Sequence, residues 1–150
     1  MQAILLVTHV LGATIWTGGH LVLALTVLPR ALKRRDPDVI REFEAGFEKL
    51  AIPALIAQVV TGMWLASGLF LGHGCWFALD DPRAPWVYAK LLLLASTVAL
   101  ALHARLRILP GLDERKLKAL AYHIVPVTVL AVLLVVAGVA IGTVATAPGS

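Results

Sequence analysis

The sequence predicts an all-α fold, a bundle of four transmembrane helices, from its composition and from the places where charges are missing. Of the 150 residues, 59% are hydrophobic and 15% are charged, and the mean hydropathy is +0.87. These values are typical of integral membrane proteins. Three long stretches contain no Asp, Glu, Lys or Arg: 3–28, 50–79 and 119–147. A fourth, 91–104, becomes long enough to cross a bilayer when 86–90 is included.

The first helix is predicted at about 3–28, and it ends before Pro29 because proline has no N–H to continue the helix. The run Asp36-Pro37-Asp38 is typical of a helix start, with proline in the first turn. It begins a short amphipathic lead-in that we expect to lie at the cytoplasmic surface of the membrane. The apolar residues of this lead-in recur at helical spacing: Ile40, Phe43, Phe47 and Leu50.

The second helix is predicted at about 50–71, with Pro53 near its start. The third covers about 86–109 and is stopped by Pro110-Gly111, and the fourth covers about 116–146. The chain contains no linker, no low-complexity stretch and no internal repeat. Residues 1–150 are therefore predicted to form a single membrane domain.

The basic residues predict the orientation of the bundle. Eleven of the thirteen lie in the first and third loops: Arg30, Lys33, Arg34, Arg35, Arg41, Lys49, Arg105, Arg107, Arg115, Lys116 and Lys118. The positive-inside rule places these loops in the cytoplasm and both termini outside, in a multi-pass protein of the cytoplasmic (inner) membrane. The pI near 9.6 then reflects topology and does not indicate a nucleic-acid partner. The N-terminal run lacks a basic start and is interpreted as a retained helix rather than a signal peptide.

Several classes of chemistry are excluded or left without support. A single cysteine, Cys75, excludes an internal disulfide and a multi-cysteine metal site. The helices contain no serine–histidine–acid set, no phosphate-binding glycine loop and no paired carboxylates. Any enzymatic activity would have to be redox chemistry carried by a cofactor.

Four of the five histidines lie in or against the apolar stretches: His9, His20, His103 and His123. An imidazole in hydrocarbon is costly and normally faces a partner or holds a ligand. Four such side chains in one short chain indicate a bound metal or haem. The alternative is that each histidine only forms a hydrogen bond between helices.

Two of these histidines share one face of the first helix. His9 and His20 are eleven positions apart, which at about 100° per residue returns to within about 20° of the same direction. The same face carries four more residues: Gly12, Ala13, Trp16 and Gly19. Small residues there would let a neighbouring helix or a flat macrocycle approach the backbone, and Trp16 would form an aromatic wall.

Depth in the bilayer sorts the histidines into two groups. His20, His103 and His123 are predicted in one layer on the cytoplasmic side, which would allow an inner site with up to three imidazoles. His9 is predicted in an outer layer that includes Lys90 and the loop residue His73. Lys90 has two interpretations, a functional side chain or one that extends toward water at the interface.

Two other polar features concern the helices themselves. Gln58 is interpreted as a hydrogen-bonding contact between helices. In the fourth helix, Pro126 cannot bond to the carbonyl of Tyr122, and that free carbonyl could orient His123. The alternative is that Pro126 only kinks the helix.

Several motifs, taken in order, resemble the CopD and HemJ-like membrane families across all four helices. The first runs from His9 through Trp16 to Gly19, followed by Leu28-Pro29-Arg30. Others are 61–65 (Thr-Gly-Met-Trp-Leu), 86–92 (Trp-Val-Tyr-Ala-Lys-Leu-Leu), and His103 with the exit 105–109. The HemJ-like resemblance implies b-type haem, protoporphyrinogen oxidation, a haem-ligand role for His9 and a functional role for Lys90. The CopD-like resemblance implies copper resistance or uptake. His20 and His123 depart from the HemJ-like pattern.

These observations together predict an integral membrane protein that binds one or two b-type haems through helix histidines and has a redox or electron-transfer role. The candidate cofactor-binding residues are His9, His20, His103, His123, Trp16, Gly12, Gly19 and Lys90, with the four histidines as metal ligands. The alternatives are a copper-binding or copper-transporting protein and an accessory subunit of a respiratory membrane complex. The predicted partners are the lipid bilayer, a redox partner or quinone, and a second copy or larger membrane assembly.

Overall fold

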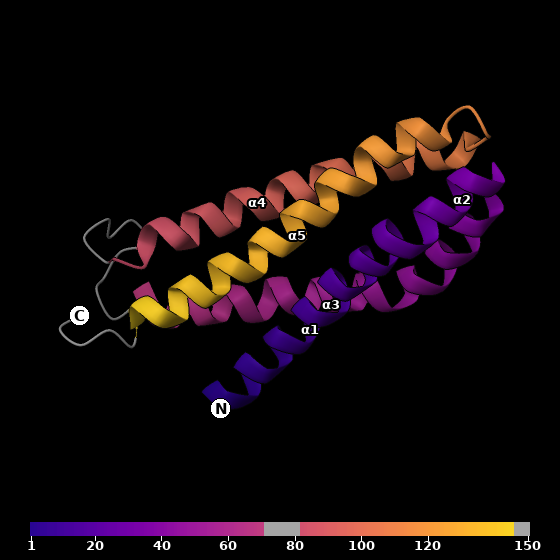
Figure 1. Cartoon of the computed structure of the whole chain (residues 1–150). Coiled ribbons are helices and arrows are strands. Elements are labelled where there is room, and N and C mark those ends of the chain that lie inside the picture. The colour runs from indigo at the N-terminus through magenta and orange to yellow at the C-terminus, as the bar shows by residue number, and fades with distance from the viewer. Residues whose placement is uncertain (71–81, 146–150) are drawn as a thin grey trace.

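The computed structural model describes residues 1–70 and 82–145, and every long element in these ranges is a helix (Figure 1). Four helices are long and apolar enough to cross a membrane: 2–34, 38–67, 84–111 and 117–144. No strand occurs in the two described ranges. The predicted fold class, all-α with four membrane-spanning helices, is confirmed.

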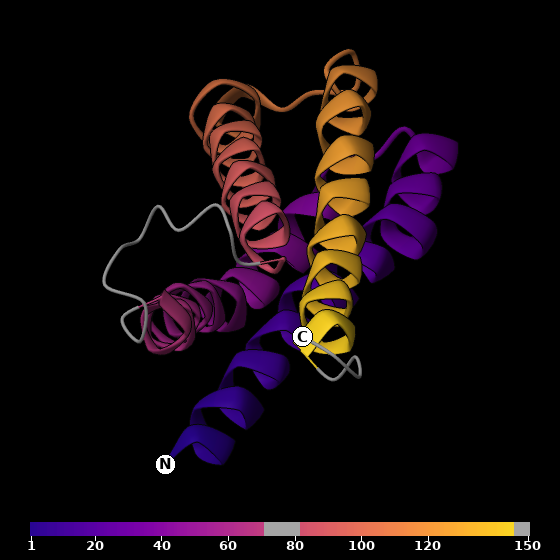
Figure 2. The ribbon, with the colours of Figure 1, turned by 90° about the vertical axis from the view of Figure 1, so that its left-hand side faces the viewer.

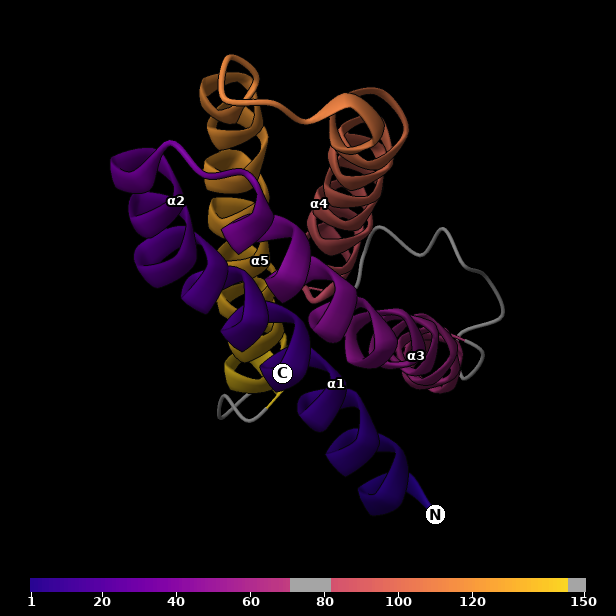
Figure 3. The same cartoon turned by 90° about the vertical axis from the view of Figure 1, so that its right-hand side faces the viewer.

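The helices pack as two neighbouring pairs. Helix α1 (Gln2–Val22) packs on α3 (Asp38–Phe70), and α4 (Ala84–His103) packs on α5 (Leu117–Ala145). Contacts between α1 and α5 join the two pairs. Views along the bundle from its two ends show α4 beside α5 and α1 crossing α5 (Figures 2 and 3).

The two basic loops lie at one end of the molecule (Figure 1). We call this end, made by residues 30–41 and 105–118, the basic end. The beginnings of α1 and α4 and the last described turn of α5 lie at the opposite end, which we call the terminal end. Both predicted basic loops thus meet on one side of the bundle.

The first helix does not end at Leu28, so that prediction was wrong. A π-helical turn, η1 (Leu23–Val27), follows α1, and the chain continues through Pro29 into α2 (Leu28–Arg34). A proline ring normally collides with the carbonyl four residues earlier, which here belongs to Leu25. Because Leu25 lies in the wider π turn, we infer that the backbone has room for the ring and the helix can continue.

A second π turn also lies just before a proline, but here the helix ends. The turn η3 (Ala104–Ile108) follows α4, and Pro110 comes two residues after it, as Pro29 comes two residues after η1. Here a short 3-10 turn, η4 (Leu109–Gly111), leads to Leu112 in an extended conformation. The predicted stop at Pro110-Gly111 is confirmed, since the helix ends in this 3-10 turn and the chain leaves it at Leu112.

The predicted start at Asp36-Pro37-Asp38 is also confirmed. Arg35 has left-handed dihedral angles (φ 55°, ψ 33°) and ends α2. The Asp36 Oδ1 atom accepts a hydrogen bond from the backbone N–H of Asp38 at 3.0 Å, which caps the start of α3. The amphipathic lead-in is the first part of α3 rather than a separate surface segment, because the helix continues through Pro53.

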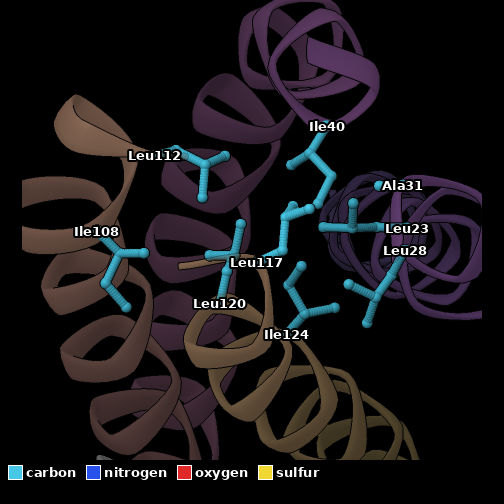
Figure 4. Packing of buried hydrophobic residues seen from close by; sticks show 9 residues of the cluster. All are labelled: Leu23, Leu28, Ala31, Ile40, Ile108, Leu112, Leu117, Leu120 and Ile124. Atoms are coloured by element: carbon cyan, nitrogen blue, oxygen red, sulfur yellow. The ribbon is translucent and has the colours of Figure 1, made fainter. Parts of the chain in front are cut away.

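The main hydrophobic core lies at the basic end and joins all four spanning helices (Figure 4). It consists of nine buried residues: Leu23, Leu28, Ala31, Ile40, Ile108, Leu112, Leu117, Leu120 and Ile124. Ile40 is 0% exposed, and Phe43 packs against the cluster. The apolar side of the lead-in therefore contacts protein, where the sequence had predicted contact with the membrane surface.

Polar contacts cross between elements at the same end. Arg105 donates to Glu48 at 2.6 Å, which links η3 to α3. Arg41 donates to the carbonyl of Leu112, which links α3 to the chain after η4. These contacts and the core hold the first pair of helices against the second at the basic end.

Large apolar side chains face outward on every spanning helix. Examples, one from each helix, are Ile4 at 73% exposure, Ile56 at 60%, Leu92 at 70% and Val139 at 61%. Such extensive apolar exposure marks contact with another apolar phase, here the lipid bilayer. The chain is a multi-pass membrane protein whose outer surface contacts lipid.

Candidate functional site

His103 and His123 form a histidine pair between α4 and α5. The His103 Nδ1 atom lies 2.9 Å from the His123 Nε2 atom. The two ring planes are nearly parallel, inclined by 14°, with centroids 5.0 Å apart. His103 is exposed and His123 is half-buried, so the pair is reachable from outside the bundle.

The hydrogen-bond partners determine which nitrogen carries a proton in this pair. His123 Nδ1 donates to the carbonyl of Ala119 at 3.0 Å, so its Nε2 presents a lone pair. His103 Nδ1 then donates to that lone pair. The carbonyl that orients His123 belongs to Ala119 one turn earlier, and not to Tyr122 as the position of Pro126 had suggested.

His20 does not join this pair. It is 8% exposed, and its Nδ1 donates to the carbonyl of Trp16 at 2.8 Å. Its ring lies 4.5 Å from the Trp16 ring and 5.5 Å from the Phe47 ring, measured between centroids. Thr128 of α5 donates to the His20 carbonyl at 3.2 Å. His20 therefore lies in a packed aromatic contact between α1 and α3.

His9 lies at the centre of a third group, toward the terminal end. Its Nδ1 is 3.0 Å from Thr61 Oγ1, and its Nε2 is 3.3 Å from Lys90 Nζ. A Cβ atom added at Gly62 would lie 2.9 Å from the His9 ring, and one added at Gly138 would lie 3.2 Å from Lys90 Nζ. The structure thus brings His9 and Lys90 into one layer, and Lys90 extends toward the bundle interior rather than toward water.

The charge on this third group is limited by the short distance between its two basic atoms. Two positive charges 3.3 Å apart repel by about 5 kcal/mol at an effective dielectric constant of about 20. The bilayer adds a further cost for every charge it surrounds. A second positive charge on His9 and Lys90 together is therefore strongly disfavoured.

Side chains of α3 fill the glycine-rich face of α1. A Cβ added at Gly12 would lie 2.8 Å from Gln58 Cγ and 3.0 Å from the Ala54 carbonyl oxygen, and one at Gly19 would overlap the ring of Phe47. Gln58 also donates to the His9 carbonyl at 2.6 Å, which confirms its role as a contact between helices. Of the two uses predicted for the small residues, the structure shows close approach of a helix, with α3 packed against Gly12 and Gly19.

The contact at Gly19 gives a testable prediction for the packing of α1 on α3. Gly19→Ala is expected to destabilise the protein by about 1–3 kcal/mol, because the added methyl group displaces the Phe47 ring. Gly18→Ala is the matched control, since a Cβ added there would meet nothing within 4 Å and alanine favours the helix. Unfolding of the detergent-solubilised variants measures both changes. Equal stability of the two variants would contradict this packing.

An apolar groove of about 470 Å³ lies between α1 and α3. Its lining residues are Ile15, Gly19, Val22, Glu42, Phe43, Gly46, Phe47 and Leu50. None of these is a histidine, so the groove offers no imidazole ligand for a metal.

The described residues also contain no group of three or more His, Cys, Asp or Glu side chains that could hold a metal ion. His73 and Cys75 lie outside the described residues. Within the described ranges, the His103–His123 pair is the one place where two imidazoles meet.

Comparison with known families identifies one of the two families that the sequence resembled. The family model of CopD, copper resistance protein D, matches residues 41–147, well over half of the chain. The chain belongs to the CopD family. No curated protein and no solved structure matches it.

The matched part of this CopD protein contains α4, α5 and all of α3 except its first three residues. It therefore includes His103, His123 and Lys90, whereas His9 and His20 precede it. The histidine pair lies wholly within the region that identifies the family.

Thr61 is a partner of His9 that the sequence named only as part of the 61–65 motif and not as a site residue. It is 6% exposed and also donates to the carbonyl of Ala57 at 2.6 Å, so its oxygen is turned to accept from His9. A signal for it was present in the run Thr61-Gly62, where a hydroxyl stands beside a glycine on an apolar helix. That pattern is typical of a close polar contact between membrane helices.

Proposed function

We propose that this CopD-family protein handles copper in the membrane and binds it as Cu(I) between His103 and His123. The observation that carries this proposal is the 2.9 Å separation of His103 Nδ1 and His123 Nε2. Copper is here the ion that the protein binds or moves, and imidazole is among the ligands that suit it. Membership of a family described as copper resistance protein D supports the choice of metal.

The pair needs little movement to accept an ion. Metal–imidazole bonds are about 2.0 Å long, so an ion between two nitrogens needs them about 4 Å apart. The two atoms would separate by about 1 Å, which small side-chain rotations can supply. The proton on His103 Nδ1 would move to its Nε2, which leaves both imidazoles neutral and both facing nitrogens free to bind.

The number of ligands favours the reduced ion. Cu(II) prefers a square-planar or tetragonal set of ligands, and the described residues place no third His, Cys, Asp or Glu beside the pair. Cu(I) accepts two nitrogen ligands in a line. A site made of two facing imidazoles therefore suits Cu(I).

The position of the pair supports exchange of the ion with one side of the membrane. His103 is the last residue of α4, is exposed, and is followed closely by Arg105 and Arg107 of the basic end. We propose that this end faces the cytoplasm and that both termini face outward, since basic loops are retained inside. Haem b is not part of the proposal, because α3 occupies the glycine-rich face of α1.

Copper X-ray absorption of the purified protein tests this function. The protein is loaded anaerobically with one equivalent of Cu(I) and separated from free metal. We expect one copper per chain, with two nitrogen neighbours at about 2.0 Å and no sulfur neighbour. Sulfur ligands from Met63 or Cys75 would overturn the site, and a metal-free chain with b-type haem absorption bands would overturn the function.

A further inference from the structure

The group around His9 has no part in the copper proposal, although it holds two basic side chains inside the membrane-spanning bundle. It draws on all four spanning helices: His9 from α1, Thr61 from α3, Lys90 from α4 and Gly138 from α5. It lies toward the terminal end, away from the His103–His123 pair. A cluster of this kind in hydrocarbon indicates a functional site.

The hydrogen bonds determine which atoms of the group can exchange a proton. The Thr61 hydroxyl donates to the Ala57 carbonyl at 2.6 Å, so its oxygen accepts from His9 Nδ1–H at 3.0 Å. The lone pair of His9 is therefore on Nε2. That lone pair faces Lys90 Nζ at 3.3 Å, and an ammonium can donate to it.

No negative charge among the described residues offsets a second proton. On α3 the facing groups are the uncharged Thr61 and Gln58, and on α5 it is Gly138. The described ion pairs all lie elsewhere, between Arg35 and Glu114, Arg41 and Asp38, and Arg105 and Glu48. On α4, Tyr88 is two residues before Lys90 and projects from a different face, and Arg83 is about two turns away along the helix.

We infer that His9 and Lys90 form a proton-binding site inside the membrane, in which one proton is shared between the imidazole Nε2 and the amine Nζ. Binding a proton changes the pair from neutral to singly charged, and the proton moves from Nζ to Nε2 without any change at Nδ1. Thr61 is a positioning residue, because it keeps the lone pair on the nitrogen that faces Lys90. The glycines at 62 and 138 allow both basic groups to approach.

A pH titration of ¹⁵N-histidine-labelled protein, copper-free and in lipid nanodiscs, tests this site by NMR. In the wild type, the His9 ring is expected as the Nδ1–H tautomer with a hydrogen-bonded Nε2. In Lys90→Met, His9 is expected to take up its proton at a pH higher by at least about one unit, because the competing base and its charge are gone. Lys118→Met, at an exposed position on the same bundle, should leave the His9 titration unchanged.

Variants of Thr61 test the positioning role separately. Thr61→Val is expected to convert a measurable share of His9 to the Nε2–H tautomer, and Thr61→Ser should restore the wild-type spectrum. A wild-type ring in the Nε2–H form would overturn the site even if Lys90→Met fails to fold. Identical His9 titrations in the wild type and in a folded Lys90→Met variant would also overturn the site. Since no copper is present, these outcomes are independent of the His103–His123 proposal.

Discussion

His123→Ala is expected to lower the affinity for Cu(I) by at least about 100-fold. Loss of a residue that merely orients a metal ligand typically costs 10–100-fold in affinity, and here one of only two ligands is lost. His103→Ala should have an effect of similar size. The double variant should be little worse than either single variant, because both residues act on one ion. Competition with a chromophoric Cu(I) chelator in detergent measures all three.

The control for this prediction is His20→Ala. His20 is also a helix histidine toward the basic end, but its ring contacts Trp16 and Phe47 and lies apart from the pair. The His20→Ala variant should bind copper with the wild-type affinity. Circular dichroism checks that this variant is folded. If His20→Ala loses copper and His123→Ala retains it, the site lies on α1 and the proposed pair is wrong.

Ile40→Ala is expected to destabilise the protein by about 2–5 kcal/mol, the usual range for truncating a fully buried isoleucine. Ile40 is 0% exposed and belongs to the cluster that joins the helices at the basic end. The lost methyl and methylene groups would leave a cavity against η1 and α5. Unfolding of the detergent-solubilised protein by a denaturing detergent measures the change.

Ile56→Ala on the same helix provides the matched comparison. Ile56 is 60% exposed, so its side chain contacts lipid or detergent in both the folded and the unfolded protein. Lipid tails are as apolar as the side chain itself, so the truncation should have an effect below about 1 kcal/mol. Similar losses for Ile40 and Ile56 would show that the buried cluster contributes little to stability.

The sequence predicted the number and type of the helices, because long uncharged runs leave few alternatives in a bilayer. It was less successful at Pro29, where it predicted a stop like the one at Pro110. A π turn precedes both prolines, but at Pro110 the helix ends in a 3-10 turn, whereas at Pro29 it continues. A change from α to π hydrogen bonding depends on packing against other helices, so the local sequence does not reveal it.

The sequence sorted the candidate site residues by expected depth in the bilayer but not by the direction in which they face. Hydropathy places His20, His103 and His123 in one layer, and it places His9 with Lys90. Which histidines meet depends on how each helix is rotated about its axis. The face of α1 that carries His20 turns toward Phe47 on α3, while His103 and His123 meet between α4 and α5. A rotation of this kind results from the contacts of the whole bundle.

The π turn η1 also affects how this chain should be aligned with its relatives. This turn adds one residue to the helix and changes the spacing of its buried positions. The spacing is three residues from His20 to Leu23, five from Leu23 to Leu28 and three from Leu28 to Ala31. A helical wheel drawn without a break over 2–34 would place Leu28 and Ala31 about 100° from the direction in which they lie. A relative whose first helix is α-helical throughout would be one residue shorter here. The resulting gap would fall inside a transmembrane helix, where alignments are normally assumed to have none.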